Sequence, residues 1–376
     1  MQPSRPPERP QPPQYGEPAR FFTAATDGVP NYSIEVAAGR WMVLMVFGSL
    51  ATPACQAAHD LILADQGLFD DANVLFYGVS IDPLDQAERG AVNAPFGRRY
   101  FRDYERKICS LYGLLSDTHL QPAVFLIDRA FRILMAEPIE ATGEVLARLR
   151  AELAAEPALE DGPFAPVLTL PRVFEPEFCQ RLIDYYQAHP ATPSGFSMTV
   201  DGRTVQRINP HLKRRQDVFI EDEALLAEVE ARLRARLFPM IKRAFNWQAV
   251  HIERFLICRY GAEEQGFFFA HRDDVTAGTA HRKFAVSLNL NAEAFLGGDL
   301  RFPEFGRRTY RPPTGGATVF CCSLLHEATP VTEGERYVFV PFLYDEDGAR
   351  IRKANLGLVG EARIDRRERR LGARRR

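Results

Sequence analysis

Residues 266–283, GFFFAHRDDVTAGTAHRK, contain the pattern that decides the fold of the C-terminal half of the chain. His271 and Asp273 are separated by one residue, and on an extended strand this spacing places both side chains on the same face. A third candidate ligand, His326, follows later in the chain, just past another predicted strand. Two histidines and one carboxylate are the ligand set of the facial triad of non-haem Fe(II) oxygenases, which leaves coordination positions open.

Neighbouring polar residues offer alternatives to this set. A histidine and a carboxylate at this spacing are often no more than surface residues. Asp274 would point to the opposite face of the strand and is expected in solvent or in a turn. His281 follows the loop sequence TAGTA, where a functional role is not required. Cys321 and Cys322, beside a predicted strand, are expected to be small packing residues.

The chain around these residues predicts helices first and short strands afterwards. EPEFCQRLIDYYQAH (175–189) predicts one helix, and DEALLAEVEARLRARLFPMIKRAF (222–245) predicts a longer one that Pro239 should bend or end. After Trp247 the hydrophobic period shifts toward two, and glycine- and proline-containing turns separate short strands. This order indicates an α+β domain with a β-sandwich or jelly-roll core.

The run from about Val167 to Tyr344 resembles the prolyl-4-hydroxylase-type Fe(II)/2-oxoglutarate-dependent dioxygenases. The pieces that carry the resemblance are RYGAEEQGFFFAHRDD, AVSLNLN, FLGGDLRFPEFG, RPPTGGATVF and LLHEATPVTEGERYVFVPF. The resemblance implies a double-stranded β-helix, also described as a jelly-roll or cupin-like fold. It also implies three iron ligands and two cosubstrate-binding residues, namely His271, Asp273 and His326 for the metal, and Arg336 and Tyr260 for 2-oxoglutarate.

Arg336 has a physical reason for this role, because a guanidinium on the strand after His326 can bind a carboxylate through two hydrogen bonds. The resemblance implies that 2-oxoglutarate and O₂ are consumed, that succinate and CO₂ are released, and that ascorbate can serve as reductant. The expected reaction is hydroxylation of an amino-acid side chain, peptidyl or free and prolyl-like. Related halogenases lack the carboxylate ligand, so Asp273 favours hydroxylation.

The N-terminal half predicts alternating strands and helices, and therefore a mainly parallel or mixed α/β sheet. The expected strands are WMVLMVFGS (41–49), NVLFYGVSID (73–82) and a pair within PAVFLIDRAFRIL (122–134). The expected helices are CQAAHDLILADQGLF (55–69) and ATGEVLARLRAELAA (141–155).

Residues 16–154 resemble the peroxiredoxins and other thioredoxin-like redoxins, on GEPARFFTAA, WMVLMVFGSLATPAC, VSIDP, DYERKICSLYGL and QPAVFLIDRAFRI. Peroxiredoxins carry a Pro-x-x-x-Thr-x-x-Cys motif, in which Thr52 and Cys55 match while Gly48 stands at the proline position. Pro122 replaces the expected arginine and resembles the thioredoxin-type cis-proline. A position at a helix N-terminus would favour the Cys55 thiolate. The alternative function is therefore a thiol peroxidase that acts through Cys55 and whose C-terminal domain is regulatory. A further alternative is that the N-terminal half is a redoxin fold without activity that serves as a docking or stability module.

Length and composition predict two domains without a membrane span. The net charge of −2 makes nucleic acid an unlikely partner. The six thinly spread cysteines show no CxxC motif and suggest a reducing cytoplasm. The expected segments are a disordered proline-rich leader (1–18), a redoxin-like domain (19–154), a linker (155–166), a dioxygenase domain (167–350) and a basic tail (351–376).

Overall fold

The structure is a computed structural model that describes residues 10–116, 119–155 and 163–359. The chain forms two compact units. The first comprises residues 1–163 and 303–306, and the second comprises residues 164–302 and 307–376. Parts of the expected leader, linker and basic tail (1–9, 156–162 and 360–376) lie outside the described residues.

A seven-stranded mixed sheet forms the centre of the N-terminal unit, in the order β2-β1-β5-β4-β3-β6-β7. Its strands are β1 (Thr23–Thr26), β2 (Val29–Ser33), β3 (Trp41–Gly48), β4 (Val74–Ser80), β5 (Arg98–Arg102), β6 (Ala123–Ile127) and β7 (Ile133–Pro138). The helices are α1 (Pro53–Ala64), α2 (Pro83–Ala87), α3 (Lys107–Leu111) and α4 (Thr142–Ala155). Strand β3 runs parallel to β4 and antiparallel to β6.

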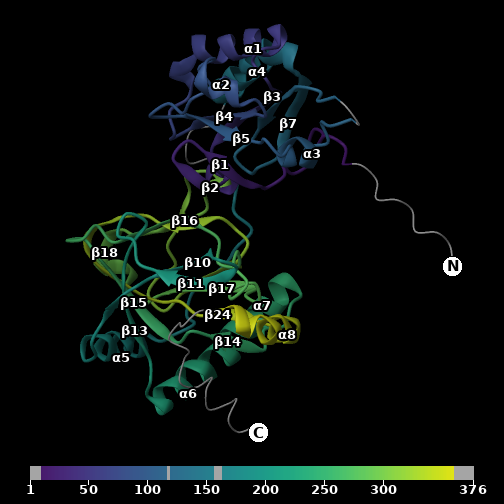
Figure 1. The fold of residues 1–376 in the computed structure, drawn as a ribbon. Coiled ribbons are helices and arrows are strands. Elements are labelled where there is room, and N and C mark those ends of the chain that lie inside the picture. Colours follow the sequence, from purple (N-terminus) through teal and green to yellow (C-terminus); the bar gives the residue numbers. More distant parts are fainter. Residues whose placement is uncertain (1–9, 117–118, 156–162, 360–376) are drawn as a thin grey trace, which may run out of the picture. The chain divides into compact units, whose positions relative to one another are not determined.

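Strand β3 is buried along all eight residues, which explains its unbroken apolar sequence. Its odd-numbered residues, from Trp41 to Phe47, share a core with α1 and α4. These two helices lie side by side against the sheet (Figure 1). Apolar residues three and four apart on α4, among them Val145 and Leu149, supply the packing face that the sequence predicts.

Three features of this unit differ from the sequence prediction or extend it. Strands β1, β2 and β5 were not predicted, because they are short and their side chains are partly exposed. Every described peptide bond is trans, so the expected cis bond at Pro122 is wrong. Within the expected leader, the amide nitrogen of Gly16 donates a hydrogen bond to the Ile133 carbonyl oxygen of β7 (2.8 Å).

Two antiparallel sheets form the C-terminal unit. The larger has ten strands, with the path β14-β24-β17-β23-β15-β13-β9 and additional pairings of β8, β18 and β21; the smaller has the order β12-β16-β22-β19-β20. The larger-sheet strands are β8 (Leu168–Leu170), β9 (Thr192–Pro193), β13 (Gln216–Phe219), β14 (His251–Glu253), β15 (Leu256–Gly261), β17 (Phe284–Asn289), β18 (Phe295–Gly297), β21 (Ala317–Cys321), β23 (Val331–Phe339) and β24 (Phe342–Tyr344). The smaller-sheet strands are β12 (Lys213–Arg214), β16 (Phe267–His271), β19 (Leu300–Arg301), β20 (Thr309–Tyr310) and β22 (His326–Ala328). A separate hairpin joins β10 (Phe196–Val200) to β11 (Arg203–Arg207).

The alternation of side chains along β23 separates the two faces of the larger sheet. Tyr337 and Phe339 belong to a core that also contains buried residues of the helices α5 (Pro176–Gln187), α6 (Glu223–Arg232) and α7 (Phe238–Phe245). Arg336 and Val338 point the other way and line a cavity, to which the smaller sheet also contributes. One face of the sheet therefore stabilises the unit while the opposite face is available for a site.

Pro239 does not end the predicted long helix. Five π-helical residues, Leu233–Leu237, join α6 to α7, and Pro239 occupies the first turn of α7. A proline there has no amide hydrogen to donate, and a wider turn accommodates its ring.

The chain after the larger sheet is partly helical. Helix α8 (Glu346–Asn355) includes the first residues of the expected basic tail. None of the described helices combines the length and the apolar character needed to span a membrane.

Candidate metal centre

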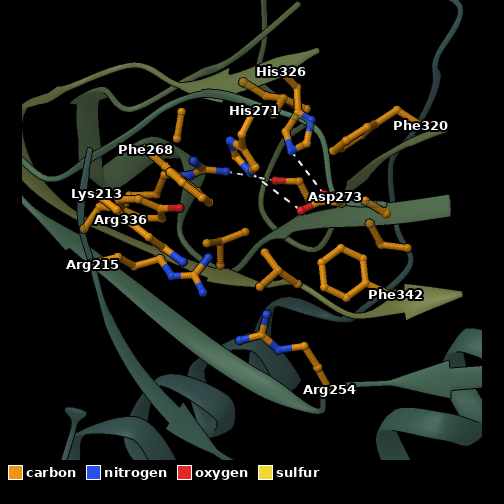
Figure 2. A pocket seen from close by; sticks show the side chains of 18 residues that line it. Lys213, Arg215, Arg254, Phe268, His271, Asp273, Phe320, His326, Arg336 and Phe342 are labelled. Atoms are coloured by element: carbon orange, nitrogen blue, oxygen red, sulfur yellow. Dashed lines mark hydrogen bonds and ion pairs between the residues drawn. The ribbon is translucent and has the colours of Figure 1, made fainter. Parts of the chain in front are cut away.

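Three side chains, from strands β16 and β22 of the smaller sheet and from the bend after β16, converge in the cavity. His271 is the last residue of β16 and is paired in register with His326, the first residue of β22. Asp273 lies in the bend just after β16, so the strand is shorter than expected, yet its carboxylate still turns toward both rings. The Asp273 carboxylate oxygens lie 3.6 Å from His271 Nε2 and 3.2 Å from His326 Nε2 (Figure 2).

Backbone carbonyl groups hold both imidazole rings in the orientation that a metal requires. His271 Nδ1 lies 2.7 Å from the Phe269 carbonyl oxygen, and His326 Nδ1 lies 3.0 Å from that of Leu324. Each Nδ1 must therefore carry the hydrogen, which leaves the Nε2 lone pair facing Asp273. One ligand atom from each of the three residues lies within 4.8 Å of the others. This donor set fits a divalent metal with two neutral nitrogens and one carboxylate oxygen.

The electrostatics of the site agree with this assignment. Burial and the nearby His326 lower the pKa of His271 to about 4, so its imidazole is neutral at physiological pH. Burial alone would raise the pKa of Asp273, but His326 and His271 outweigh this effect and hold it well below its ordinary value. The carboxyl group is therefore ionised where a cation would bind.

Arg336 and Tyr260 face the same cavity from the larger sheet, where they are paired in register across β23 and β15. The Arg336 guanidinium lies 5.4 Å from the centre of the Tyr260 ring. One of its terminal nitrogens donates to Ser287 Oγ (2.9 Å) and to Asn289 Oδ1 (3.4 Å). Arg336 is only 4% exposed, and its Nε has no hydrogen-bond partner among the described residues. A buried guanidinium with unused donors is suited to an anionic ligand.

Two further cations line this cavity, and the sequence marked them only as part of a basic cluster. The sequence KRR (213–215) predicts a basic cluster near the pocket entrance, either a solvated loop or a site for an acidic substrate group or a partner. Lys213 and Arg215 are buried, so the solvated-loop alternative is wrong for these two residues. Arg215 Nε lies 2.7 Å from Asp217 Oδ1 in a buried ion pair. Lys213 Nζ donates to the Gly195 carbonyl oxygen (2.8 Å) and lies 4.2 Å from the centre of the Phe268 ring. Successive side chains on an extended segment point to opposite sides, so the sequence could have placed Lys213 and Arg215 on one side and Arg214 on the other.

Arg254 is a cavity residue that the sequence analysis did not identify. Its backbone adopts the left-handed region, with φ at +66°. This conformation is uncommon for a residue with a side chain and costs free energy. The side chain is 26% exposed, lines the cavity and points toward the other labelled residues (Figure 2).

The remaining polar residues near the triad have structural partners. His281 is 1% exposed, and its Nε2 lies 2.8 Å from Glu253 Oε2. Arg282 donates to the same carboxylate, which explains the burial of both residues. Asp274 lies in the bend after β16 and accepts a hydrogen bond from Ser323, and it is not part of the group formed by the triad. Of the two adjacent cysteines, Cys322 is buried and Cys321 is partly exposed.

In the N-terminal unit, the structure places Thr52 and Cys55 at the start of α1. Thr52 is the N-cap residue, although its side chain makes no capping hydrogen bond. The Cys55 thiol is fully buried and donates to the Phe47 carbonyl oxygen (3.1 Å). Burial, followed by Glu140 and Asp85, raises the pKa of Cys55 to about 11. Here burial outweighs the helix terminus, so the environment favours the thiol over the thiolate.

The two halves of the chain are similar to different known proteins. Residues 15–135, about a third of the chain, match the model of the AhpC/TSA family, which confirms the redoxin-like N-terminal half. No curated protein matches the sequence.

Similar solved structures include enzymes of both expected kinds. The viral collagen prolyl hydroxylase from Paramecium bursaria Chlorella virus-1, as its 2-oxoglutarate complex, is 14% identical, with a TM-score of 0.36 over 50% of this chain and 98% of the viral chain. A Pseudomonas putida prolyl-4-hydroxylase is 18% identical, with a TM-score of 0.36 over 53% of this chain and 98% of that one. Yeast mitochondrial 1-Cys peroxiredoxin is 22% identical, with a TM-score of 0.32 over 38% and 78%. At these identities, the activities of those proteins are not carried over to this chain.

Proposed function

We propose that the C-terminal unit is an Fe(II)- and 2-oxoglutarate-dependent dioxygenase that hydroxylates an amino-acid side chain, peptidyl or free. The observation that carries this proposal is the convergence of His271, Asp273 and His326 on one point in a cavity that also contains Arg336. We further propose that the two sheets form a double-stranded β-helix, since both contribute side chains to that cavity.

The chain supplies the binding geometry of this reaction. His271, Asp273 and His326 would hold the metal, and Arg336, supported by Ser287, would bind the distal carboxylate of 2-oxoglutarate. A bound Fe(II) supplies O₂-dependent oxidation, in which 2-oxoglutarate yields succinate and CO₂ and a C–H bond is hydroxylated. The apolar walls exclude water and so protect the reaction from side products. These walls include Phe268, Leu300, Phe320, Val338 and Phe342.

Three finer features belong to the same proposal. Ascorbate would act as a reductant and not as a substrate. A proline-like or related side chain would be the target. A cytoplasmic location is supported by the six cysteines, all of which are free. Peroxide reduction at Cys55 is not included, because the buried thiol and its raised pKa do not favour it.

Anaerobic titration of the metal-free protein with Fe(II) and 2-oxoglutarate tests the proposal through the visible charge-transfer band of the chelate. We expect a saturable band in the wild type and none in Asp273→Ala. Arg336→Gln should retain the metal but require at least about tenfold more 2-oxoglutarate, because a buried charge-assisted pair contributes more than about 1.4 kcal/mol.

Two variants control for nonspecific effects. Asp274→Asn alters the neighbouring carboxylate, which contacts Ser323 and not the triad. Arg259→Gln alters the neighbour of Tyr260 in the sequence. The Arg259 guanidinium pairs with Glu335 and Glu264. Both should behave as the wild type. A folded wild-type protein that gives no band would refute the proposed function.

A further inference from the structure

The cavity contains more positive charge than the proposed metal and cosubstrate can neutralise. Four cationic side chains line it, together with a single carboxylate, Asp273. The cations are Lys213, Arg215, Arg254 and Arg336. Asp217, behind the wall, offsets Arg215 through their ion pair, and Asp273 offsets one more charge. A divalent metal and doubly charged 2-oxoglutarate cancel each other, so two positive charges remain without a counter-ion when Lys213 is counted in its ammonium form.

Such an excess is costly in a buried site unless an anion completes it. Arg282 packs against the ring of the lining residue Phe342, and it does not add to the excess because Glu253 neutralises it (2.7 Å). Burial, followed by the nearby Arg215, lowers the pKa of Lys213 well below its ordinary value. Burial therefore disfavours the Lys213 ammonium group, and an anion bound beside it would favour the charged form.

Arg254 is the cation best placed to meet an additional ligand. Its guanidinium makes no hydrogen bond to any described residue, and its closest acidic neighbour, Asp217 Oδ2, lies 3.9 Å away and is already paired with Arg215. It is the most exposed of the four cations, since the other three are at most 9% exposed. Its backbone adopts the costly left-handed conformation, while its guanidinium has, among the described residues, only the 3.9 Å approach to Asp217 and a 5.8 Å contact with the Phe342 ring.

From these observations we infer that Arg254, with Lys213 beside it, forms a second anion site in the cavity and that the substrate carries a carboxylate bound there. The inference rests on the proposed function, because it names the substrate class of the same site. A guanidinium recognises a carboxylate through two parallel hydrogen bonds, and a neighbouring ammonium group adds a third donor. The carboxylate can be the α-carboxylate of an amino acid or chain terminus, or that of an acidic side chain.

The test uses the full chain loaded anaerobically with Mn(II) and saturating 2-oxoglutarate, so that Arg336 is already occupied. Calorimetric titration then compares N-acetyl-L-proline, its uncharged amide, and the α-amide of N-acetyl-L-glutamic acid. We expect at least one of the two acids to bind at least tenfold more tightly than the uncharged amide. The acid that binds identifies which kind of carboxylate is recognised.

Variants separate a role in anion binding from a structural role. Arg254→Gln should abolish the preference for the acid, and Arg254→Lys should restore part of it, while the affinity for 2-oxoglutarate stays unchanged. Lys213→Gln should reduce the preference, and Arg259→Gln should leave it intact. Circular dichroism, and the charge-transfer band in separate samples loaded with Fe(II) and 2-oxoglutarate, report whether each variant is folded.

The outcomes distinguish this inference from the proposed function. If the band forms but neither acid is preferred over the amide, the inference is overturned and the function stands. If Arg254→Gln weakens 2-oxoglutarate instead of the acid, Arg254 serves the cosubstrate and the inference is likewise overturned. An acid preference that depends on Arg254 in a protein without the band would support the anion site while refuting the dioxygenase. If the protein shows neither the band nor an acid preference, both the proposed function and the anion site are refuted.

Discussion

Cys55 shows how the surroundings of one residue change the chemistry that its position suggests. The thiol lies in the first turn of α1, but it is buried, and its pKa is raised to about 11. At pH 7 the thiolate fraction should be about a hundredfold lower than for an ordinary cysteine, because each pKa unit changes it tenfold. We expect slow alkylation by iodoacetamide that accelerates as pH rises toward 11, and no stoichiometric oxidation by hydrogen peroxide at pH 7.

Peptide mass spectrometry of the native protein measures this prediction, with the partly exposed Cys321 as an internal reference for access. Unfolding in denaturant should abolish the protection of Cys55. Rapid oxidation at pH 7 that disappears in Cys55→Ser would instead support the thiol peroxidase.

Asp217 is the residue whose removal should destabilise the C-terminal unit most directly. Asp217→Asn leaves the Arg215 guanidinium buried without its counter-ion, which costs about 3–5 kcal/mol. Urea unfolding should show this loss, while Asp347→Asn, in an exposed pair with Arg350, should change stability by less than about 0.5 kcal/mol. A loss below about 1 kcal/mol for Asp217→Asn would contradict the structural role of the ion pair.

The same carboxyl group predicts a pH dependence of stability. Burial alone would raise the pKa of Asp217, but Arg215 and Lys213 hold it well below the value of an unfolded chain. A lowered native pKa contributes stability that is present above about pH 4 and is lost as the pH falls. The difference in unfolding free energy between the wild type and Asp217→Asn should therefore shrink as the pH is lowered below 4.

At the scale of elements, the turn before β21 depends on a close approach that only glycine permits. Gly315 has φ at +75°, and a Cβ atom there would lie 2.1 Å from the Phe174 carbonyl oxygen. The Gly315 carbonyl oxygen also accepts hydrogen bonds from the Val173 and Phe174 amides, which tie the start of α5 to the sheet. We expect Gly315→Ala to lower the free energy of unfolding by about 3 kcal/mol, since both the backbone and the contact are unfavourable.

Gly202, in the turn between β10 and β11, is the matched control. Its φ is +72°, but no atom lies within 4 Å of the position that a Cβ would take. Gly202→Ala should therefore cost only about 1 kcal/mol, the conformational part of the effect. Equal losses in the two variants by chemical denaturation would show that the contact at Gly315 contributes nothing.

At the scale of the whole molecule, each unit has its own hydrophobic core, so we expect two thermal transitions. Mn(II) with 2-oxoglutarate should raise only the transition of the C-terminal unit. The stabilisation is about 2.7 kcal/mol when the ligand is at a hundred times its Kd. Scanning calorimetry with and without the ligands measures this effect.

The variant Leu149→Ala identifies the thermal transition of the N-terminal unit. Leu149 is fully buried in the core of the N-terminal unit, and its truncation should cost that unit about 2–5 kcal/mol. A single transition that moves with both the ligand and the variant would contradict independent unfolding of the units.

The sequence predicted much of the fold wherever local pattern and tertiary environment agree. The apolar run of β3 and the helical sequence patterns of α4 and α5 were sufficient, because a segment buried on both faces is apolar throughout and a segment buried on one face alternates with its period. The edge strands β1, β2 and β5 were missed, since partly exposed short strands carry little pattern. The π-helical turn before Pro239 was predicted only as a bend.

For the candidate site, the sequence by itself indicated His271, Asp273, His326 and Arg336, through the one-residue spacing of the first two and the family resemblance that covers all four, and the structure brings all four to one cavity. Only the tertiary structure decided how deeply charge is buried. It placed Lys213 and Arg254 in the cavity and buried the Cys55 thiol. The physical reason is that desolvation and charge balance depend on every segment packed around a group, and most of those segments are distant in sequence.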